Sequence, residues 1–232
     1  MSKREPDTTL RTPLDRERVL ETAVALARRE GIDSVSMRKL AQELGVGAMT
    51  LYHYVPNKER LLDGMVDIVF GEIELPPTGP DWRTAMRRRA LSTREVLNHH
   101  RWAVGLMESR AVPGPASLRL HDAVLGCLRE GGFPVELAVH AYSVLDAYIY
   151  GFALQEKNVP FETAEESAAV AKEQVRHFTA AAGEQFAVEF PYLAEVVGGH
   201  VAVVGYDFAA AFEDGLGLIL DALEERRRRG RG

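Results

Sequence analysis

The stretch SMRKLAQELGVGAMTLYHYVPNK, residues 36–58, decides the fold of this chain. Ser36 is a favourable helix N-cap, and apolar residues follow it at helical spacing until Gly45. A second short helix is predicted after Gly47, and Asn57 begins another. Two helices joined by a tight turn that contains glycine are the form in which proteins present a helix to the major groove of DNA. The stretch therefore predicts a helix-turn-helix.

The second short helix of this motif is expected to meet DNA. Four apolar side chains are positioned to hold the two helices together: Ala41, Leu44, Val46 and Leu51. The outward residues that follow carry hydroxyl, aromatic and cationic groups: Thr50, Tyr52, His53, Tyr54 and Lys58. Such groups bond to phosphates and to base edges, so these residues are the first candidates for an interface with nucleic acid.

Helices are predicted on both sides of the motif, and the fold class is all-α. Upstream, Asp15 caps a helix that ends at Gly31, and residues 1–13 read as a disordered tail. Downstream, the run LPPTGP at residues 75–80 breaks the helical pattern. Apolar residues at spacings of three and four then predict helices near residues 82–99, 102–109, 116–130, 135–157, 163–182 and 203–228.

Composition narrows the classes of protein that the chain can represent. The 232 residues carry a net charge of −6, so any contact with DNA has to come from a local patch. Cys127 is the only cysteine, which excludes an internal disulfide and a cysteine-rich zinc site and suggests a small buried apolar residue. No cofactor or metal site is predicted. No run reaches the roughly 20 apolar residues of a membrane span, and a cytoplasmic protein is expected.

Three runs within residues 40–62, LAQELGV, TLYHYV and NKERLL, resemble the TetR family of transcriptional regulators. The likeness extends upstream to Val19 and implies that the DNA-binding candidates contact an operator. By this resemblance, Arg38, Thr50, Tyr52 and His53 contact bases or phosphates, and Lys58 contacts a phosphate. The positions from which family members often read bases are occupied here by Gly47, Ala48 and Met49. These three side chains offer almost no hydrogen-bonding group, so sparse direct readout is expected, with contact to thymine methyl groups as one possibility.

The C-terminal half more weakly resembles the ligand-binding domain of the tetracycline repressor. The runs LREGGF at residues 128–133 and YIYG at residues 148–151, with the apolar pattern of residues 208–223, carry this likeness. It implies a homodimer joined by a four-helix bundle from helices near residues 135–157 and 203–226, and therefore a pseudo-palindromic operator of double-stranded DNA. The helix at residues 135–157 is apolar on nearly every side, so it is expected to be buried nearly all round.

The resemblance also gives the expected domain organisation and a site for a small-molecule effector. A helix-turn-helix head at residues 14–60 is followed by an effector-binding and dimerisation domain at residues 61–228 and a frayed tail at residues 229–232. Together they are expected to contain about nine to ten helices. The candidates for the effector pocket are Arg94, His99, His100, Trp102, Met107, Tyr148, Phe152, His177 and Phe178. An aromatic residue or methionine at helical spacing is more often plain core than part of a pocket. Adjacent histidines such as His99 and His100 do not form a metal pair on a helix.

The favoured function is a repressor that a small-molecule effector releases from its operator. An activator, or a regulator without a ligand, has the same sequence features and stays open. A helical enzyme is a remote alternative, because the sequence has no phosphate-binding loop and none of the Ser-x-x-Lys, Gly-x-Ser-x-Gly or His-Glu-x-x-His motifs.

Overall fold

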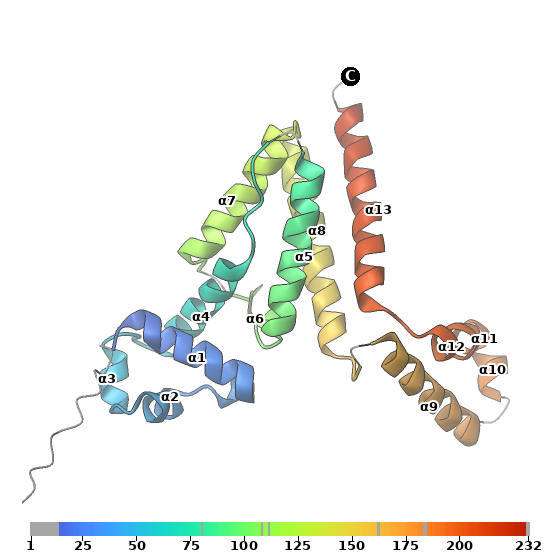
Figure 1. Cartoon of the computed structure of the whole chain (residues 1–232), viewed down its shortest axis with the longest axis horizontal. Coiled ribbons are helices and arrows are strands. Elements are labelled where there is room, and N and C mark those ends of the chain that lie inside the picture. Colours follow the sequence, from blue (N-terminus) through green and yellow to red (C-terminus); the bar gives the residue numbers. More distant parts are fainter. Residues whose placement is uncertain are drawn as a thin grey trace, which may run out of the picture. The chain divides into compact units, whose positions relative to one another are not determined.

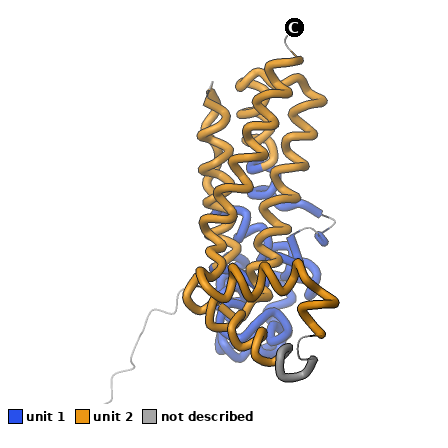
Figure 2. The backbone as a smooth tube through the Cα atoms, turned by 90° about the vertical axis from the view of Figure 1, so that its right-hand side faces the viewer, with its two compact units in different colours: residues 1–73, 99–120 blue, residues 74–98, 121–232 orange. Residues whose placement is uncertain are grey.

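The computed structural model describes residues 14–79, 81–107, 109–110, 112–161, 163–182 and 185–230, with no account of the side chains of residues 178–182. Every regular element in these ranges is a helix (Figure 1), which confirms the all-α prediction. They form two compact units (Figure 2). Unit 1 contains the described residues up to Ile73 together with residues 99–120, and unit 2 contains residues 74–98 and those from His121 onwards.

Unit 1 contains the helix-turn-helix. Its helices are α1 (Arg16–Glu30), α2 (Met37–Leu44), α3 (Ala48–Tyr52), α4 (Lys58–Glu72) and α6 (Val104–Met107), with a 3₁₀ turn η1 (Ile32–Ser34) and the beginning of α7 (Pro115–Glu130). The predicted caps are confirmed. Asp15 Oδ1 accepts from the Arg18 amide at 2.8 Å, Ser36 Oγ from the Lys39 amide at 3.2 Å, and Asn57 Oδ1 from the Arg60 amide at 2.9 Å. Each cap satisfies an N–H that the helix itself cannot.

The turn between α2 and α3 depends on Gly45, which has a left-handed backbone with φ of 66°. A residue with a Cβ atom avoids this region, whereas glycine adopts it without steric cost. The Gly45 amide donates to the carbonyl group of Gln42 at 3.2 Å, and the Val46 amide donates to that of Ala41 at 3.0 Å. These two bonds end α2 and turn the chain sharply into α3.

Unit 2 is built from long helices. These are α5 (Trp82–His99), most of α7, α8 (Val135–Lys157), α9 (Ala164–Ala182) and α13 (Phe208–Arg229), and α8 and α13 run side by side in Figure 1. Trp82 packs edge-on against Phe133, with ring centroids 4.6 Å apart. The apolar pattern predicted for residues 208–223 packs inward, since Phe212, Leu216, Leu220 and Leu223 of α13 are buried and Ile219 is half-buried. Cys127 is buried as predicted, and burial raises the pKa of its thiol to about 11.

The predicted burial of α8 on nearly every side is wrong for the single chain. One face packs inward through Leu145 and Ile149, but the opposite side is open and Val135 is 63% exposed. Val139, Val144 and Leu154 are exposed as well. Among the described helices, α8 alone has the length and apolar composition that could cross a bilayer, features that a core helix of a soluble protein shares. An open apolar side of this kind is typical of an interaction surface.

The structure differs from the sequence prediction in two further segments. The helix expected at residues 102–109 is only the short α6, which begins two residues later. The last helix begins at Phe208 rather than near residue 203, because Gly205 has φ of 79° and Asp207 caps the helix by accepting from the Ala209 amide at 2.8 Å. A methyl group at position 205 would lie 1.9 Å from the carbonyl oxygen of Ala164, so only glycine fits this crossing.

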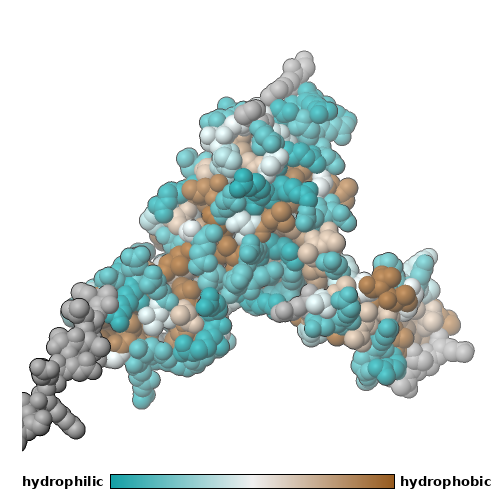
Figure 3. Space-filling view, in the orientation of Figure 1, coloured by the Kyte–Doolittle hydropathy of each residue, from teal (hydrophilic) through white to brown (hydrophobic). Residues whose placement is uncertain are grey.

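A group of short helices precedes α13 and was not predicted. It consists of α10 (Gln185–Glu189), α11 (Pro191–Ala194), the π-helical segment η2 (Glu195–Val201) and α12 (Ala202–Val204), of which η2 and α12 pack on α9. The group exposes large apolar side chains, and brown patches mark it in Figure 3: Val188, Phe190, Tyr192, Leu193, Val196, Val203 and Val204. Exposed apolar surface of this extent is typical of interaction sites.

Candidate DNA interface and effector site

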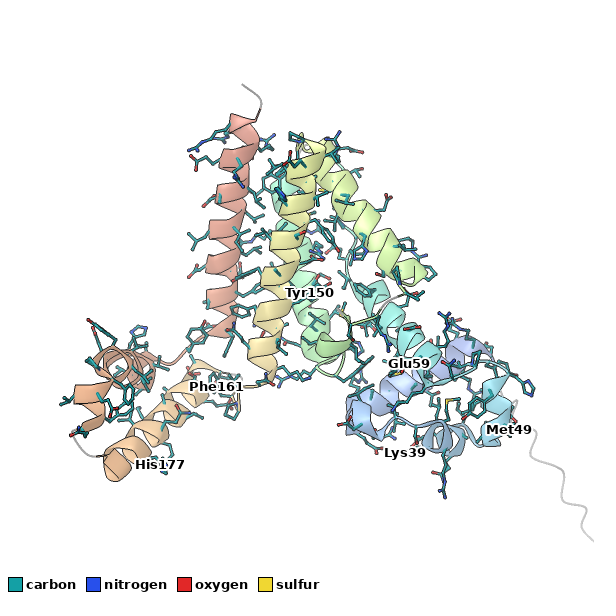
Figure 4. The ribbon with its side chains drawn as sticks, turned by 180° about the vertical axis from the view of Figure 1, so that it is seen from behind. Lys39, Met49, Glu59, Tyr150, Phe161 and His177 are labelled. Carbon is teal, nitrogen blue, oxygen red and sulfur yellow. The ribbon has the colours of Figure 1, made fainter. Side chains whose placement is uncertain are left out.

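The helix-turn-helix exposes most of the predicted DNA-binding side chains. Arg38, Thr50, Tyr52, His53 and Lys58 are all exposed, and Tyr54 is half-buried. Gly47 and Ala48 are exposed as well, and Met49, labelled in Figure 4, is 75% exposed although it is apolar. The structure therefore brings the predicted set together on α2, α3 and the beginning of α4.

The short helix α3 is held in place by buried apolar side chains and by backbone hydrogen bonds. Leu51 and Val55 are buried against the core of unit 1, as is Leu40 of α2. The Tyr54 and Val55 amides both donate to the Leu51 carbonyl oxygen, at 3.0 and 2.9 Å. Because the anchors point inward, the residues between them point outward. The exposure of Thr50, Tyr52 and His53 thus follows from the apolar spacing of the sequence.

Ion pairs between α1 and α2 stabilise the motif, and the cations in these pairs are less free to contact DNA. Arg29 contacts Glu43 at 2.8 Å, and Lys39 pairs with Glu30. Hydrogen bonds from Lys39 and from Arg29 hold the pKa of the Glu30 carboxyl below its ordinary value. Arg38 lies beside Lys39 in the sequence but is exposed, so of these two cations it has the freer approach to a phosphate.

The base of α4 is tied to the segment that leads into α7. Arg110 contacts Asp63 at 3.2 Å and Glu59, labelled in Figure 4, at 2.5 Å. Asp67 Oδ1 accepts hydrogen bonds from the Ala116 and Ser117 amides at 2.9 and 3.0 Å, and it thereby caps α7. Lys58, the first residue of α4, belongs to a helix that is fixed further along by these carboxylates.

Three of the predicted effector residues lie together in unit 2. Arg94 Nε donates to Glu156 at 3.0 Å, and its guanidinium carbon is 5.5 Å from the ring centroid of Phe212. The Tyr148 hydroxyl donates to the carbonyl oxygen of Phe212 at 2.9 Å, and Phe152 contacts the same ring edge-on with centroids 5.1 Å apart. Arg94, Tyr148 and Phe152 are thus parts of one aromatic cluster between α5, α8 and α13.

The other predicted effector residues do not join this cluster. His100, Trp102 and Met107 are buried in unit 1, where His100 Nε2 is 2.8 Å from Glu72 and its ring is edge-on to Trp102. His99 and His177 are exposed. The side chain of Phe178 lies outside the described residues.

A buried polar cluster in unit 2 was missed by the sequence reasoning. Arg89 of α5 is 1% exposed, and its Nη1 lies 2.5 Å from Oδ1 of Asp146 on α8, which is also buried. Burial works to lower the pKa of the Arg89 guanidinium, but the Asp146 charge prevails and the pKa is raised. Burial and Asp146 together raise the pKa of the Tyr142 phenol. One feature of the sequence could have revealed this cluster: Arg89 lies on the buried face of α5. The other buried residues of this face are Trp82, Ala85, Met86, Ala90 and Thr93.

Each unit has an open cleft within its described part, and no predicted effector residue lines either of these two clefts. A cleft of about 540 Å³ in unit 1 lies between α1, α4 and residues 112–115, and Arg16, Leu20 and Asp63 are among its lining residues. A polar cleft of about 460 Å³ in unit 2 separates the beginning of α5 from the end of α13. No cluster of three or more metal-binding side chains occurs among the residues that the structure describes.

A capped helix-turn-helix that exposes hydroxyl and aromatic groups on α3, with the cations Arg38 on α2 and Lys58 on α4, defines a DNA-binding protein of the helix-turn-helix class. Comparison with known families narrows this class. Residues 19–65 match the family of bacterial regulatory proteins named tetR, and residues 75–227 match the tetracyclin repressor-like C-terminal domain. The chain belongs to the TetR family and is a DNA-binding transcriptional regulator.

Similar proteins of known function agree with this family assignment. The transcriptional repressor DrrR1 of Streptomyces coeruleorubidus is 37% identical over 65% of this chain, but the match covers only 56% of DrrR1. The class A tetracycline repressor of transposon 1721, from Escherichia coli, is 29% identical over 98% of this chain and 94% of its own length. The crystal structure of apo ActR from Streptomyces coelicolor superimposes with a TM-score of 0.75 at 29% identity, covering 94% of this chain and 99% of ActR.

Proposed function

We propose that this chain is a homodimeric repressor that binds a pseudo-palindromic operator through α2, α3 and the beginning of α4, and that a small-molecule effector releases it. The observation that carries the proposal is the exposed set on a capped and braced head: Arg38, Thr50, Tyr52, His53 and Lys58. In this proposal residues 14–60 form the DNA-binding domain and residues 61–228 the effector-binding and dimerisation domain of a cytoplasmic protein.

Within the head, each side chain has a role that its chemistry supports. Lys58 neutralises a phosphate at the beginning of α4, where unpaired amides add to the attraction. Arg38, Thr50, Tyr52 and His53 bond to phosphates or base edges. Gly47, Ala48 and Met49 allow α3 to approach the groove closely, and the half-buried Tyr54 lies at the margin of the interface.

Dimerisation is supported by the open apolar surface of the two neighbouring helices α8 and α13. Val135, Val139 and Val144 of α8 and Leu218 of α13 are exposed in the single chain. A second copy that presents the same two helices would cover them in a four-helix bundle. Two-fold symmetry then places two reading heads against two half-sites, which explains the pseudo-palindromic operator of the proposal.

Effector binding is supported by the relatives and by the polar and aromatic groups inside unit 2. ActR has been crystallised in complex with actinorhodin, and that structure superimposes on this chain with a TM-score of 0.74 at 28% identity. For this chain, we place the effector among α5, α7 and α8 of unit 2. Release follows if the effector binds more tightly to the conformation in which the two heads no longer fit their half-sites.

The experiment that tests the DNA-binding role begins with selection of genomic fragments by the purified full-length protein. Binding of a selected fragment is then measured by fluorescence anisotropy for the wild type and for Tyr52→Ala. We expect at least about a tenfold loss of affinity for a base- or phosphate-contacting side chain, with the thermal unfolding temperature almost unchanged because Tyr52 is exposed. Equal binding by the two proteins would refute the proposed interface.

The dimer is tested separately by sedimentation equilibrium at micromolar concentration. We expect the mass of two chains for the wild type, and a shift toward the monomer for Val139→Glu, which places a charge on the open α8 face. Tyr52→Ala serves as the control variant, because it lies in the head and should remain dimeric. A monomeric wild type would contradict the four-helix-bundle proposal.

A further inference from the structure

The pair formed by Arg89 and Asp146 is unusual because both charges are buried within one helical unit. Arg89 extends from α5, and Asp146 lies on α8 between Tyr142 and Tyr150, each one helical turn away. Figure 4 labels Tyr150 on this face of α8. The ring of His121 on α7 is edge-on to Tyr142, with centroids 5.4 Å apart. Three helices thus enclose one polar centre.

This polar centre has unused hydrogen-bonding capacity. A guanidinium group carries five N–H donors, yet none of the three side-chain nitrogens of Arg89 has a hydrogen bond of good geometry to any residue that the structure describes. Asp146 Oδ1 lacks one as well within the same described ranges, although it forms the ion pair. Buried polar groups in folded proteins almost always find partners in the protein, in water or in a ligand. Apart from the contact between Arg89 and Asp146 themselves, the centre therefore has hydrogen-bonding groups that water or a polar ligand can satisfy.

The charges of this polar centre restrict the net charge of a ligand that can bind there. The guanidinium and the carboxylate together have no net charge, and the Tyr142 phenol stays neutral because its pKa is raised. A buried anion would set two negative charges against one guanidinium, which is costly where water is excluded. A neutral molecule avoids this cost. It can accept from Arg89 through a carbonyl oxygen and donate to Asp146 through a hydroxyl group.

The surroundings of the centre favour an aromatic guest. Tyr142 and Tyr150 lie near enough to Arg89 to act on its charge, and the ring of His121 is edge-on to that of Tyr142, so aromatic rings surround the pair. Aromatic rings pack well against such walls.

Building on the proposed effector-released repressor, we infer that Arg89, together with Asp146, determines effector specificity. The guest is a neutral aromatic compound with a carbonyl group and a hydroxyl group on neighbouring positions. Arg89 donates to the carbonyl oxygen, and the hydroxyl group donates to Asp146. Tyr142 shields the pair from water.

The test compares hydroxylated probes with their O-methylated twins by isothermal titration calorimetry on the full-length protein. The probes are danthron with its dimethyl ether, and ortho-hydroxyacetophenone with ortho-methoxyacetophenone. Salicylate is the anionic comparison. We expect at least one hydroxylated probe to bind about tenfold more tightly than its twin, since a buried donor or acceptor left unpaired costs about that factor. The inference is overturned if neither hydroxylated probe outperforms its twin, or if salicylate binds more tightly than both.

Variants at the centre show whether the preference comes from these residues. Arg89→Met removes the donors, so the preference for the hydroxylated probe should disappear. Arg87→Met is the matched control on the same helix, because Arg87 is exposed and pairs with Glu213 at the surface; it should keep the preference. Retention of the preference by Arg89→Met would refute the role of Arg89.

A second variant guards against misfolding. Arg89→Met leaves Asp146 buried without its partner, so the protein could unfold, whereas Arg89→Met/Asp146→Leu removes both charges at similar volume. The double variant should remain folded by circular dichroism, bind the operator like the wild type, and stay bound when the preferred probe is added. If it is released like the wild type, the inference fails while the proposed function stands. If the wild type binds no operator, the proposed function itself fails.

Discussion

The head of unit 1 and the α5–α8 pair of unit 2 handle polar groups in opposite ways. The head keeps Arg38, Tyr52 and Lys58 exposed, and the ion pairs that brace it are at the surface. Unit 2 instead buries Arg89 and Asp146 between helices. Exposed groups cost little to maintain and can read a large, charged partner such as DNA. Buried groups cost much more, and the small ligand inferred for unit 2 would meet them away from water.

The largest expected effect is on stability, from breaking the buried pair. Asp146→Ala leaves the Arg89 charge buried alone and should reduce the free energy of unfolding by about 3–5 kcal/mol. The matched change in an exposed pair on α13, Glu213→Ala, should cost about 0–1 kcal/mol. Urea denaturation followed by circular dichroism at one fixed protein concentration measures both, since dimers unfold in a concentration-dependent way. Similar losses for the two variants would erase the contrast between buried and exposed pairs.

The next effect is on DNA binding and not on stability. Lys58→Ala removes one expected phosphate contact, so operator affinity should fall by about tenfold at low salt and the salt dependence of the binding constant should weaken by about one ion. Lys172→Ala, an exposed lysine on α9, is the control. Anisotropy titrations over a series of salt concentrations provide both values. A salt dependence that matches the wild type would place Lys58 away from the phosphates.

A smaller effect is expected from the cap of α2. Ser36→Ala removes the oxygen that accepts from the Lys39 amide and should lower the free energy of unfolding by about 1 kcal/mol. Ser36→Asp should restore most of this loss, because aspartate is an equally good cap. Thermal and urea unfolding of the three proteins make the comparison. No recovery in Ser36→Asp would show that the hydroxyl acts through something other than capping.

The smallest expected effect is the pH dependence that Glu224 adds. Hydrogen bonds from Arg227 and Arg228 hold the pKa of this carboxyl at about 2, below the 4.5 of an ordinary glutamate. Its stabilising contribution is therefore complete above about pH 4.5 and is lost as the pH falls toward 2. For a pair at the surface the contribution should stay below about 1 kcal/mol. Unfolding of the wild type and Glu224→Gln across this range should converge at the acidic end; parallel curves would exclude the effect.

The sequence predicted those parts of the fold whose signals are local. Helices α5 and α8 have the predicted bounds, because proline-containing breaks precede them and their apolar residues recur regularly. The three caps of the head were equally visible, since Ser36, Asp15 and Asn57 act on amides three residues away. The exposure of the DNA-binding candidates followed from the spacing of their buried neighbours.

The rest depended on contacts between distant residues. The irregular helices before α13 carry no single period, so their pattern gave no signal. Arg89 and Asp146 are 57 positions apart in the sequence, and only the packed structure shows that they meet. The predicted effector residues share only their residue types, which do not distinguish the cluster of Arg94, Tyr148 and Phe152 from the buried His100 and Trp102 of the other unit.

The crossing at Gly205 sets a limit on how this chain can vary. A side chain there would overlap the Ala164 carbonyl group, and the backbone with φ of 79° already disfavours any residue but glycine. In a library with all amino acids at this position, selection for folded protein should therefore return glycine alone. Neighbouring Val203 and Val204 are exposed and free of such constraint. Substitutions there would change the exposed apolar surface of the short helices without disturbing the turn into α13.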